Sequence, residues 1–286
     1  MKLTNTSGNN KVPTIIALLL VGLIASAIIF PSKQIVYAHT FTGDESASFM
    51  SVIKILQAEA NLVQSNLASN LTLAQDHAKA LVDVVKGNHT FGVLPDEVSE
   101  NNKRVAADVI HTANALQTAL KSKPTPTLTD LGPKISNLNA TLQEAVAVRL
   151  PKDAAGNSTI NALATKDLVN ETLRQYSFAF GVANAKGGSN NETGNPSGVG
   201  GQGTSTNMSA YQSAQGLASQ TQGMQIQAKS VIPTNATSAT KAAVAKLDVD
   251  LSQLKKTINQ KDSYDEVATL VQKTIYPDID TAFRLK

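Results

Sequence analysis

The chain has 286 residues, with 25 lysines and arginines, 22 aspartates and glutamates, and no cysteine. The absence of cysteine excludes disulfides, thiolate catalysis and cysteine-ligated metal centres. Lys2, Lys11 and Lys33 are the only charged residues among the first 38, so the other 248 residues carry 22 basic and 22 acidic side chains. This neutral remainder has no basic surface for nucleic acid, and we exclude nucleic-acid binding.

The first 38 residues have the pattern of an export signal. Two lysines precede an uncharged apolar run, and Val36 and Ala38 suit the −3 and −1 positions of a signal-peptidase site. We therefore predict a mature chain that begins at His39 and works at the cell surface or outside the cell. The alternative is an uncleaved anchor, in which residues 12–30 would be the only contact with a membrane. Both interpretations place the rest of the chain outside.

From residue 44 onward, apolar residues recur at three- and four-residue spacing, which predicts helices, and the period-two alternation of strands is missing. We expect four helices in residues 39–150, at about 44–68, 72–86, 96–121 and from 131 to a stop at Pro151. Pro124 and Pro126 are expected to end the third of these. Helices of this length joined by short loops favour an antiparallel bundle.

The helical pattern resumes at residue 158. Helices are expected at about 158–182 and 208–229, then around 244–258, and finally in a segment that opens with the capping box Ser263 and Glu266. Residues 184–207 are rich in glycine, serine and asparagine, which predicts a flexible insertion that buries no core. The predicted fold is all-α: an antiparallel helical bundle of two tandem four-helix units, 39–150 and 158–286.

The two predicted units share a weak internal correspondence. Asn70-Leu-Thr and Gln75 match Asn207-Met-Ser and Gln212 at an offset of 137 residues. The segments 147–150 and 282–285 match at an offset of 135. A nearly constant offset favours duplication of one unit. The alternative is that alanine-rich helices of similar length resemble one another without common descent.

Histidines are the main candidates for metal ligands. Metal sites in helical bundles use Glu-x-x-His, which is absent here, and the nearest equivalents are Asp108-Val-Ile-His111 and the pair Asp76-His77. If the signal is cleaved, the amino group and imidazole of His39 can chelate Cu(II), with His77 or His111 as a further ligand. The sequence thus offers a copper or iron site from His39, His77, Asp108 and His111, against the alternative of solvated or structural histidines.

Asparagines in the glycosylation pattern Asn-x-Ser/Thr are unusually frequent. There are eight after the export signal: Asn70, Asn88, Asn139, Asn157, Asn170, Asn191, Asn207 and Asn235. An exported protein with these sequons is predicted to be glycosylated, preferentially in the loops at Asn88, Asn157, Asn191 and Asn235. The alternative is a polar helix surface in a chain rich in Asn, Ser and Thr.

No pattern in the sequence supports catalysis. Gly-x-Ser-x-Gly does not occur, and the glycines of residues 198–203 are not followed by the Lys-Ser/Thr of a phosphate-binding loop. We therefore expect a protein that is not an enzyme and has no resident cofactor, apart from the copper or iron considered above.

The segment His39-Thr-Phe-Thr-Gly-Asp-Glu-Ser-Ala-Ser-Phe49, the helix at 208–229 and the ending Ile275–Lys286 resemble uncharacterised exported helical-bundle proteins of ammonia-oxidising archaea. The resemblance implies an archaeal cell envelope and Asn-linked glycans, but no activity. The leading hypothesis is an exported cell-envelope or secreted protein of interaction or structural type, whose partner is an unknown protein or envelope component. The alternative is an extracytoplasmic protein that handles copper or iron.

Overall fold

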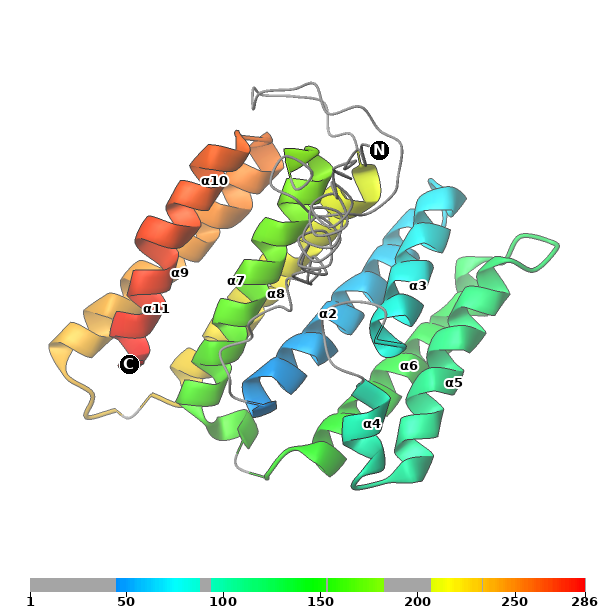
Figure 1. Cartoon of the computed structure of the whole chain (residues 1–286), viewed down its shortest axis with the longest axis horizontal. Helices are drawn as coiled ribbons and strands as arrows, with labels where there is room; N and C mark the ends of the chain where they lie inside the picture. Colours follow the sequence, from blue (N-terminus) through cyan, green and yellow to red (C-terminus); the bar gives the residue numbers. More distant parts are fainter. Residues whose placement is uncertain (1–44, 88–93, 153, 183–206, 233, 286) are drawn as a thin grey trace, which may run out of the picture. The chain divides into compact units, whose positions relative to one another are not determined.

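The structure, a computed structural model, describes the chain from residue 45 to residue 285 with four gaps (Figure 1). Residues 1–44, 88–93, 153, 183–206, 233 and 286 are not described. The predicted export signal, His39 and nearly all of the predicted insertion at 184–207 lie outside the described residues.

Every regular element in the described ranges is a helix, which confirms the predicted all-α bundle. The first part of the chain forms α2 (Glu45–Asn66), α3 (Leu71–Val85), α4 (Leu94–Ser99), α5 (Lys103–Leu120) and α6 (Leu128–Arg149). After the short 3₁₀ turn η1 (Ala154–Gly156) come α7 (Ser158–Ala179), α8 (Met208–Ser230), α9 (Ser238–Gln260), α10 (Tyr264–Leu270), the π-helical η3 (Val271–Ile275) and α11 (Tyr276–Phe283). None of these helices is long and apolar enough to cross a membrane.

Polar side chains define where most of the helices begin. Each accepts a hydrogen bond from a backbone N–H of the first turn, which would otherwise lack a partner. The capping residues are Asn70, Asn102, Thr127, Asn157, Asn207, Thr237 and Ser263. The predicted capping box of Ser263 and Glu266 is confirmed.

The single helix predicted over 96–121 is wrong, because two helices, α4 and α5, occupy this range. The side chain of Asn102 accepts hydrogen bonds from the N–H groups of Arg104 (3.1 Å) and Val105 (3.2 Å). Its backbone is extended, with φ −157° and ψ 100°. Asparagine competes with helical hydrogen bonding in this way, so α4 ends and a new helix starts.

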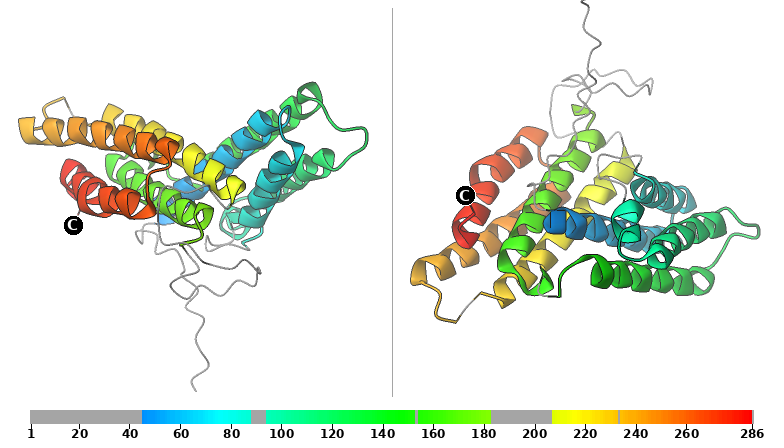
Figure 2. Two further views of the ribbon diagram at one scale, coloured as in Figure 1. Left: turned by 90° about the horizontal axis from the view of Figure 1, so that it is seen from above. Right: turned by 60° about the horizontal axis from the view of Figure 1, so that its bottom comes forward.

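The helices pack as two rings of four that contact each other mainly through α2, with a smaller contact between α3 and α8. In the first ring α2 contacts α3, α3 contacts α5, α5 contacts α6, and α6 returns to α2. In the second, α7, α8, α9 and the α10–α11 segment follow the same order. The helix α2 also packs against both α7 and α8, which therefore have neighbours in both rings (Figures 1 and 2).

The buried apolar side chains extend across the contact between the two rings. Buried side chains form two clusters, and the cluster built mainly by α2–α6 includes Ala164, Leu168, Leu217 and Met224 from α7 and α8. By contact density, residues 39–286 form one compact unit. A duplicated pair of four-helix units stays a prediction about the origin of the chain.

Candidate functional site

Five polar side chains meet where α2, α3 and α8 pack together, and we refer to them as the His77 cluster: Glu59, Asn66, His77, Gln212 and Ser213. The imidazole of His77 is completely buried, and Glu59, Asn66 and Ser213 are at most 5% exposed. Burying polar groups is unfavourable unless they are hydrogen-bonded, so these side chains require partners, which they find in one another.

The carboxylate of Glu59 is the centre of the cluster. Its Oε2 atom lies 2.7 Å from Nδ1 of His77, and its Oε1 atom accepts a hydrogen bond of 2.7 Å from the hydroxyl of Ser213. Because Glu59 belongs to α2, His77 to α3 and Ser213 to α8, one carboxylate connects three helices.

The two amides determine where the protons lie. Nδ2 of Asn66 donates to the carbonyl of Leu62 (2.9 Å), which defines the orientation of this amide. The same nitrogen donates to Oε1 of Gln212 (2.9 Å), and Nε2 of Gln212 donates back to Oδ1 of Asn66 (3.1 Å). Oε1 of Gln212 also lies 2.9 Å from Nε2 of His77, so this ring nitrogen must carry a hydrogen.

This geometry favours a protonated His77 that faces the carboxylate of Glu59. Burial disfavours its charged form, but hydrogen bonding to Glu59 and the charge of Glu59 outweigh burial, with further contributions from Gln212 and Asp76. As a result, the pKa of His77 lies above its ordinary value.

The His77 cluster can hold a proton, but it presents no reactive group. The hydroxyl of Ser213 donates to Glu59, and both side chains are at most 4% exposed, so a substrate cannot reach this hydroxyl in this packing. Both ring nitrogens of His77 face hydrogen-bond partners, which leaves no lone pair for a metal ion. The geometry connects helices and does not support His77 as a metal ligand.

The other residues of the predicted metal site are not gathered around His77. Asp108 accepts a 2.6 Å hydrogen bond from Arg104, one turn earlier on α5, and His111 is exposed on the same helix. Across the described ranges, no three His, Asp or Glu side chains form a group that could hold a metal ion. His39 lies outside these ranges, so the copper site at the mature N-terminus stays a prediction.

From the sequence we expect no Ser-x-x-Lys motif that activates a serine, but Ser51 and Lys54 have this spacing, which is typical of some acyl-transfer enzymes. The hydroxyl of Ser51 is completely buried and donates to the carbonyl of Ala47 at 2.8 Å. Burial lowers the pKa of the Lys54 amine. Because a substrate cannot reach Ser51 in this packing, the pair does not form a catalytic site.

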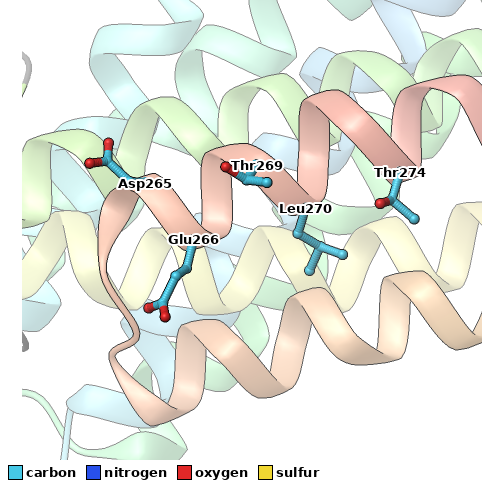
Figure 3. A pocket seen from close by; sticks show the side chains of 5 residues that line it. All are labelled: Asp265, Glu266, Thr269, Leu270 and Thr274. Atoms are coloured by element: carbon cyan, nitrogen blue, oxygen red, sulfur yellow. The ribbon is translucent and has the colours of Figure 1, made fainter.

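A shallow depression lies on α10 and η3 (Figure 3). It is lined by Asp265, Glu266, Thr269, Leu270 and Thr274. The carboxylate of Glu266 is already bonded to Ser263 in the capping box. The depression is wide open to solvent, unlike the concave sites that enclose small ligands.

The structure separates the predicted glycosylation sites by environment. Asn88 and Asn191 lie outside the described residues. Asn139 and Asn170 lie within α6 and α7 and are half-buried. Four further sequon asparagines are exposed at helix starts or in a turn: Asn70, Asn157, Asn207 and Asn235.

Sequence reasoning singled out His77 but missed its partners. A signal was present, because Glu59 and Asn66 follow Leu56 and Val63 at three-residue intervals and so fall on the apolar stripe of the predicted helix. An acid and an amide on such a stripe require buried partners. The sequence does not show that the partners come from residue 77 and from residues 212 and 213.

No family model, curated protein or solved structure matches this chain. Any statement about function therefore rests on the sequence and on the geometry of the described residues.

Proposed function

We propose that this chain is an exported cell-envelope or secreted helical-bundle protein that acts through interaction or as structure, and not by catalysis. The observation that carries this proposal is the His77 cluster. Its acid, imidazole, hydroxyl and amides are the richest set of chemical groups that we find in the described residues, and they bond to one another across three helices.

The export part of the proposal is supported by the sequence. Lys2 and Lys11 precede the apolar run, and Val36 and Ala38 suit signal-peptidase cleavage. An exported chain without cysteine has no disulfides, so its stability must come from its apolar core and buried hydrogen bonds. The packing of α2 against α7 and α8 supplies such a core.

Cleavage can be tested in the cells that make the protein. We expect the chain in the envelope or secreted fraction to begin at His39. The variant Ala38→Phe should remain uncut, because signal peptidase requires a small residue at −1. The matched variant Gln34→Phe, which changes position −5, should still be cut. Chain that retains Met1 and stays with cytoplasmic markers would contradict export.

The interaction part can be tested by cross-linking intact cells with a reagent that does not cross the membrane. We expect one envelope component to be joined to the chain reproducibly, and its attachment to involve particular exposed lysines. A chain that forms no cross-link while neighbouring envelope proteins do would contradict an interaction role.

A further inference from the structure

We propose that four of the six sequons in the described chain carry N-linked glycans: Asn70, Asn157, Asn207 and Asn235. The remaining two, Asn139 and Asn170, stay unmodified. This inference rests on the proposed export, since glycans of this type are added to exported chains. All six asparagines match Asn-x-Ser/Thr equally well, so it is the structure that divides them.

Transfer of an N-linked glycan requires a particular geometry of the acceptor asparagine and its sequon hydroxyl. A bond forms between Nδ2 of asparagine and the anomeric carbon of a saccharide carried on a polyprenyl phosphate or diphosphate. The bond from that carbon to the phosphate oxygen breaks, the phosphate leaves with the electron pair, and the amide loses one proton. The sequon pattern requires the hydroxyl two residues later, so an acceptor must present both groups together.

Asn139 and Asn170 cannot present both groups. Successive residues of an α-helix are rotated by about 100°, so residues i and i+2 lie about 200° apart and point away from each other. The hydroxyl-bearing residues Thr141 and Thr172 are buried. Their hydroxyls donate to carbonyl groups of their own helices, at 2.9 and 2.7 Å.

Asn70, Asn157 and Asn207 stand immediately before α3, α7 and α8, where the backbone is extended. Their φ angles are −153°, −88° and −130°. All three are exposed, and each caps its helix through Oδ1 alone. A sugar on Nδ2 therefore leaves the cap in place.

Asn235 meets the same requirement in a different way. It is exposed in the turn between α8 and α9, and its sequon hydroxyl belongs to Thr237, the exposed N-cap of α9. The Thr237 hydroxyl accepts the N–H of Thr240 at 3.2 Å. Neither residue of this sequon lies inside a helix.

The test uses the purified, folded full chain as acceptor for a single-subunit oligosaccharyltransferase with a saccharide–polyprenyl-diphosphate donor. Peptide mass spectrometry should find the saccharide on the four exposed asparagines and not on Asn139 or Asn170. Synthetic peptides that contain Asn139 or Asn170 should be modified, which would show that folding, and not the local sequence, protects these two sites.

Matched variants separate the sequon from the helix cap. Thr72→Ala removes the hydroxyl but keeps the Asn70 cap, so the glycan at Asn70 should disappear without a change in melting temperature. Asn70→Gln should remove the glycan and also lower the melting temperature, because the cap is lost.

Two outcomes would overturn the inference: modification of Asn139 or Asn170 in the folded chain as fast as at the exposed sites, or no modification at the exposed sites. Failure of the proposed function is distinguishable from both. Chain from its own cells that retains Met1 and stays with cytoplasmic markers would overturn export, whatever the pattern of acceptors in the purified system.

Discussion

At the scale of single residues, the most consequential feature is the charged pair of Glu59 and His77. Its 2.7 Å contact is buried, and Ser213 and Gln212 satisfy the remaining polar atoms. A buried pair of this kind adds modest stability compared with apolar residues of the same size, but removing one partner leaves an uncompensated charge. The pair therefore constrains how α2, α3 and α8 meet.

Replacing both partners of the pair should cost less than the two single replacements added together. We expect Glu59→Leu to lower the free energy of unfolding by about 3–5 kcal/mol, because His77 loses its counter-ion. The double variant Glu59→Leu/His77→Leu should be less unstable than the sum of the single variants, with a coupling of about 0.5–3 kcal/mol. Urea unfolding of the wild type, the two single variants and the double variant measures this double-mutant cycle. Strictly additive losses in the free energy of unfolding would contradict the pairing.

The raised pKa of His77 predicts a loss of stability at alkaline pH. The native chain holds this proton more tightly than the unfolded chain, whose histidines titrate with a pKa of about 6.5. The stabilisation is complete below about pH 6.5 and disappears as the pH rises through the native pKa, by at most about 1.4 kcal/mol per pH unit.

Unfolding free energies at a series of pH values from 6 to 9 test this prediction. His77→Gln should remove the part of the decrease in unfolding free energy with rising pH that His77 causes. His111→Gln is the matched control, since His111 is exposed on α5, and it should keep the wild-type slope. If the unfolding free energy changed with pH equally in the wild type and in His77→Gln, the pH dependence could not be assigned to His77.

At the scale of elements, α2 and α8 approach each other closely at one small residue. A Cβ atom at Gly216 of α8 would lie 3.3 Å from Cδ1 of Leu62 and 3.7 Å from Cβ of Ala58, both on α2. This approach lets Ser213 and Gln212, within one turn of Gly216, reach Glu59 and Asn66. At Gly223, two turns later, a Cβ atom would meet nothing within 4 Å.

Enlarging the two glycines should therefore have opposite effects. Gly216→Leu should lower the free energy of unfolding by about 1–3 kcal/mol, because the side chain has no space between α2 and α8. Gly223→Ala should raise it by about 1 kcal/mol, since alanine favours the helix and the site is open. Thermal and urea unfolding measure both. Destabilisation by Gly223→Ala would contradict the packing described here.

At the scale of the whole molecule, the two rings of helices are joined by shared apolar packing. The residues Ala164, Leu168, Leu217 and Met224 of α7 and α8 lie in one cluster with the core of α2–α6. The Glu59–Ser213 hydrogen bond crosses the same contact. Unfolding one ring would expose part of the core of the other, so the two should unfold together.

Cooperative unfolding can be measured with single cysteines, because the chain has none of its own. Ala113→Cys places a thiol in the core of the first ring and Ala282→Cys in that of the second; both sites are at most 2% exposed. The two thiols should become reactive at the same urea concentration. Two separate midpoints would show that the rings unfold independently.

Much of the fold could be predicted from local patterns. The three- and four-residue spacing of apolar side chains determined the helices, and Ser263 with Glu266 determined where α10 begins. The split of the predicted helix 96–121 was missed, because the capping bonds of Asn102 depend on its own backbone conformation. Pro124 with Pro126, and Pro151, indicated where two further helices end, at Leu120 and Arg149.

The candidate site could be predicted only in part. His77 was visible as a histidine in a helix, but the same pattern suited a metal ligand, a surface residue or a buried ion pair. Its partners lie 18 residues away at Glu59 and 135 residues away at Gln212. No local spacing encodes such contacts, because they depend on how helices pack.

The sequence by itself determined the helical class, the absence of disulfides and the predicted export signal, since these depend on composition and on neighbours along the chain. Only the tertiary structure decided that α2 joins both rings, that Glu59 faces His77, and which sequons lie inside helices. The physical reason is that a helix can form from its own sequence pattern, whereas the partner of a buried polar side chain is supplied by another helix.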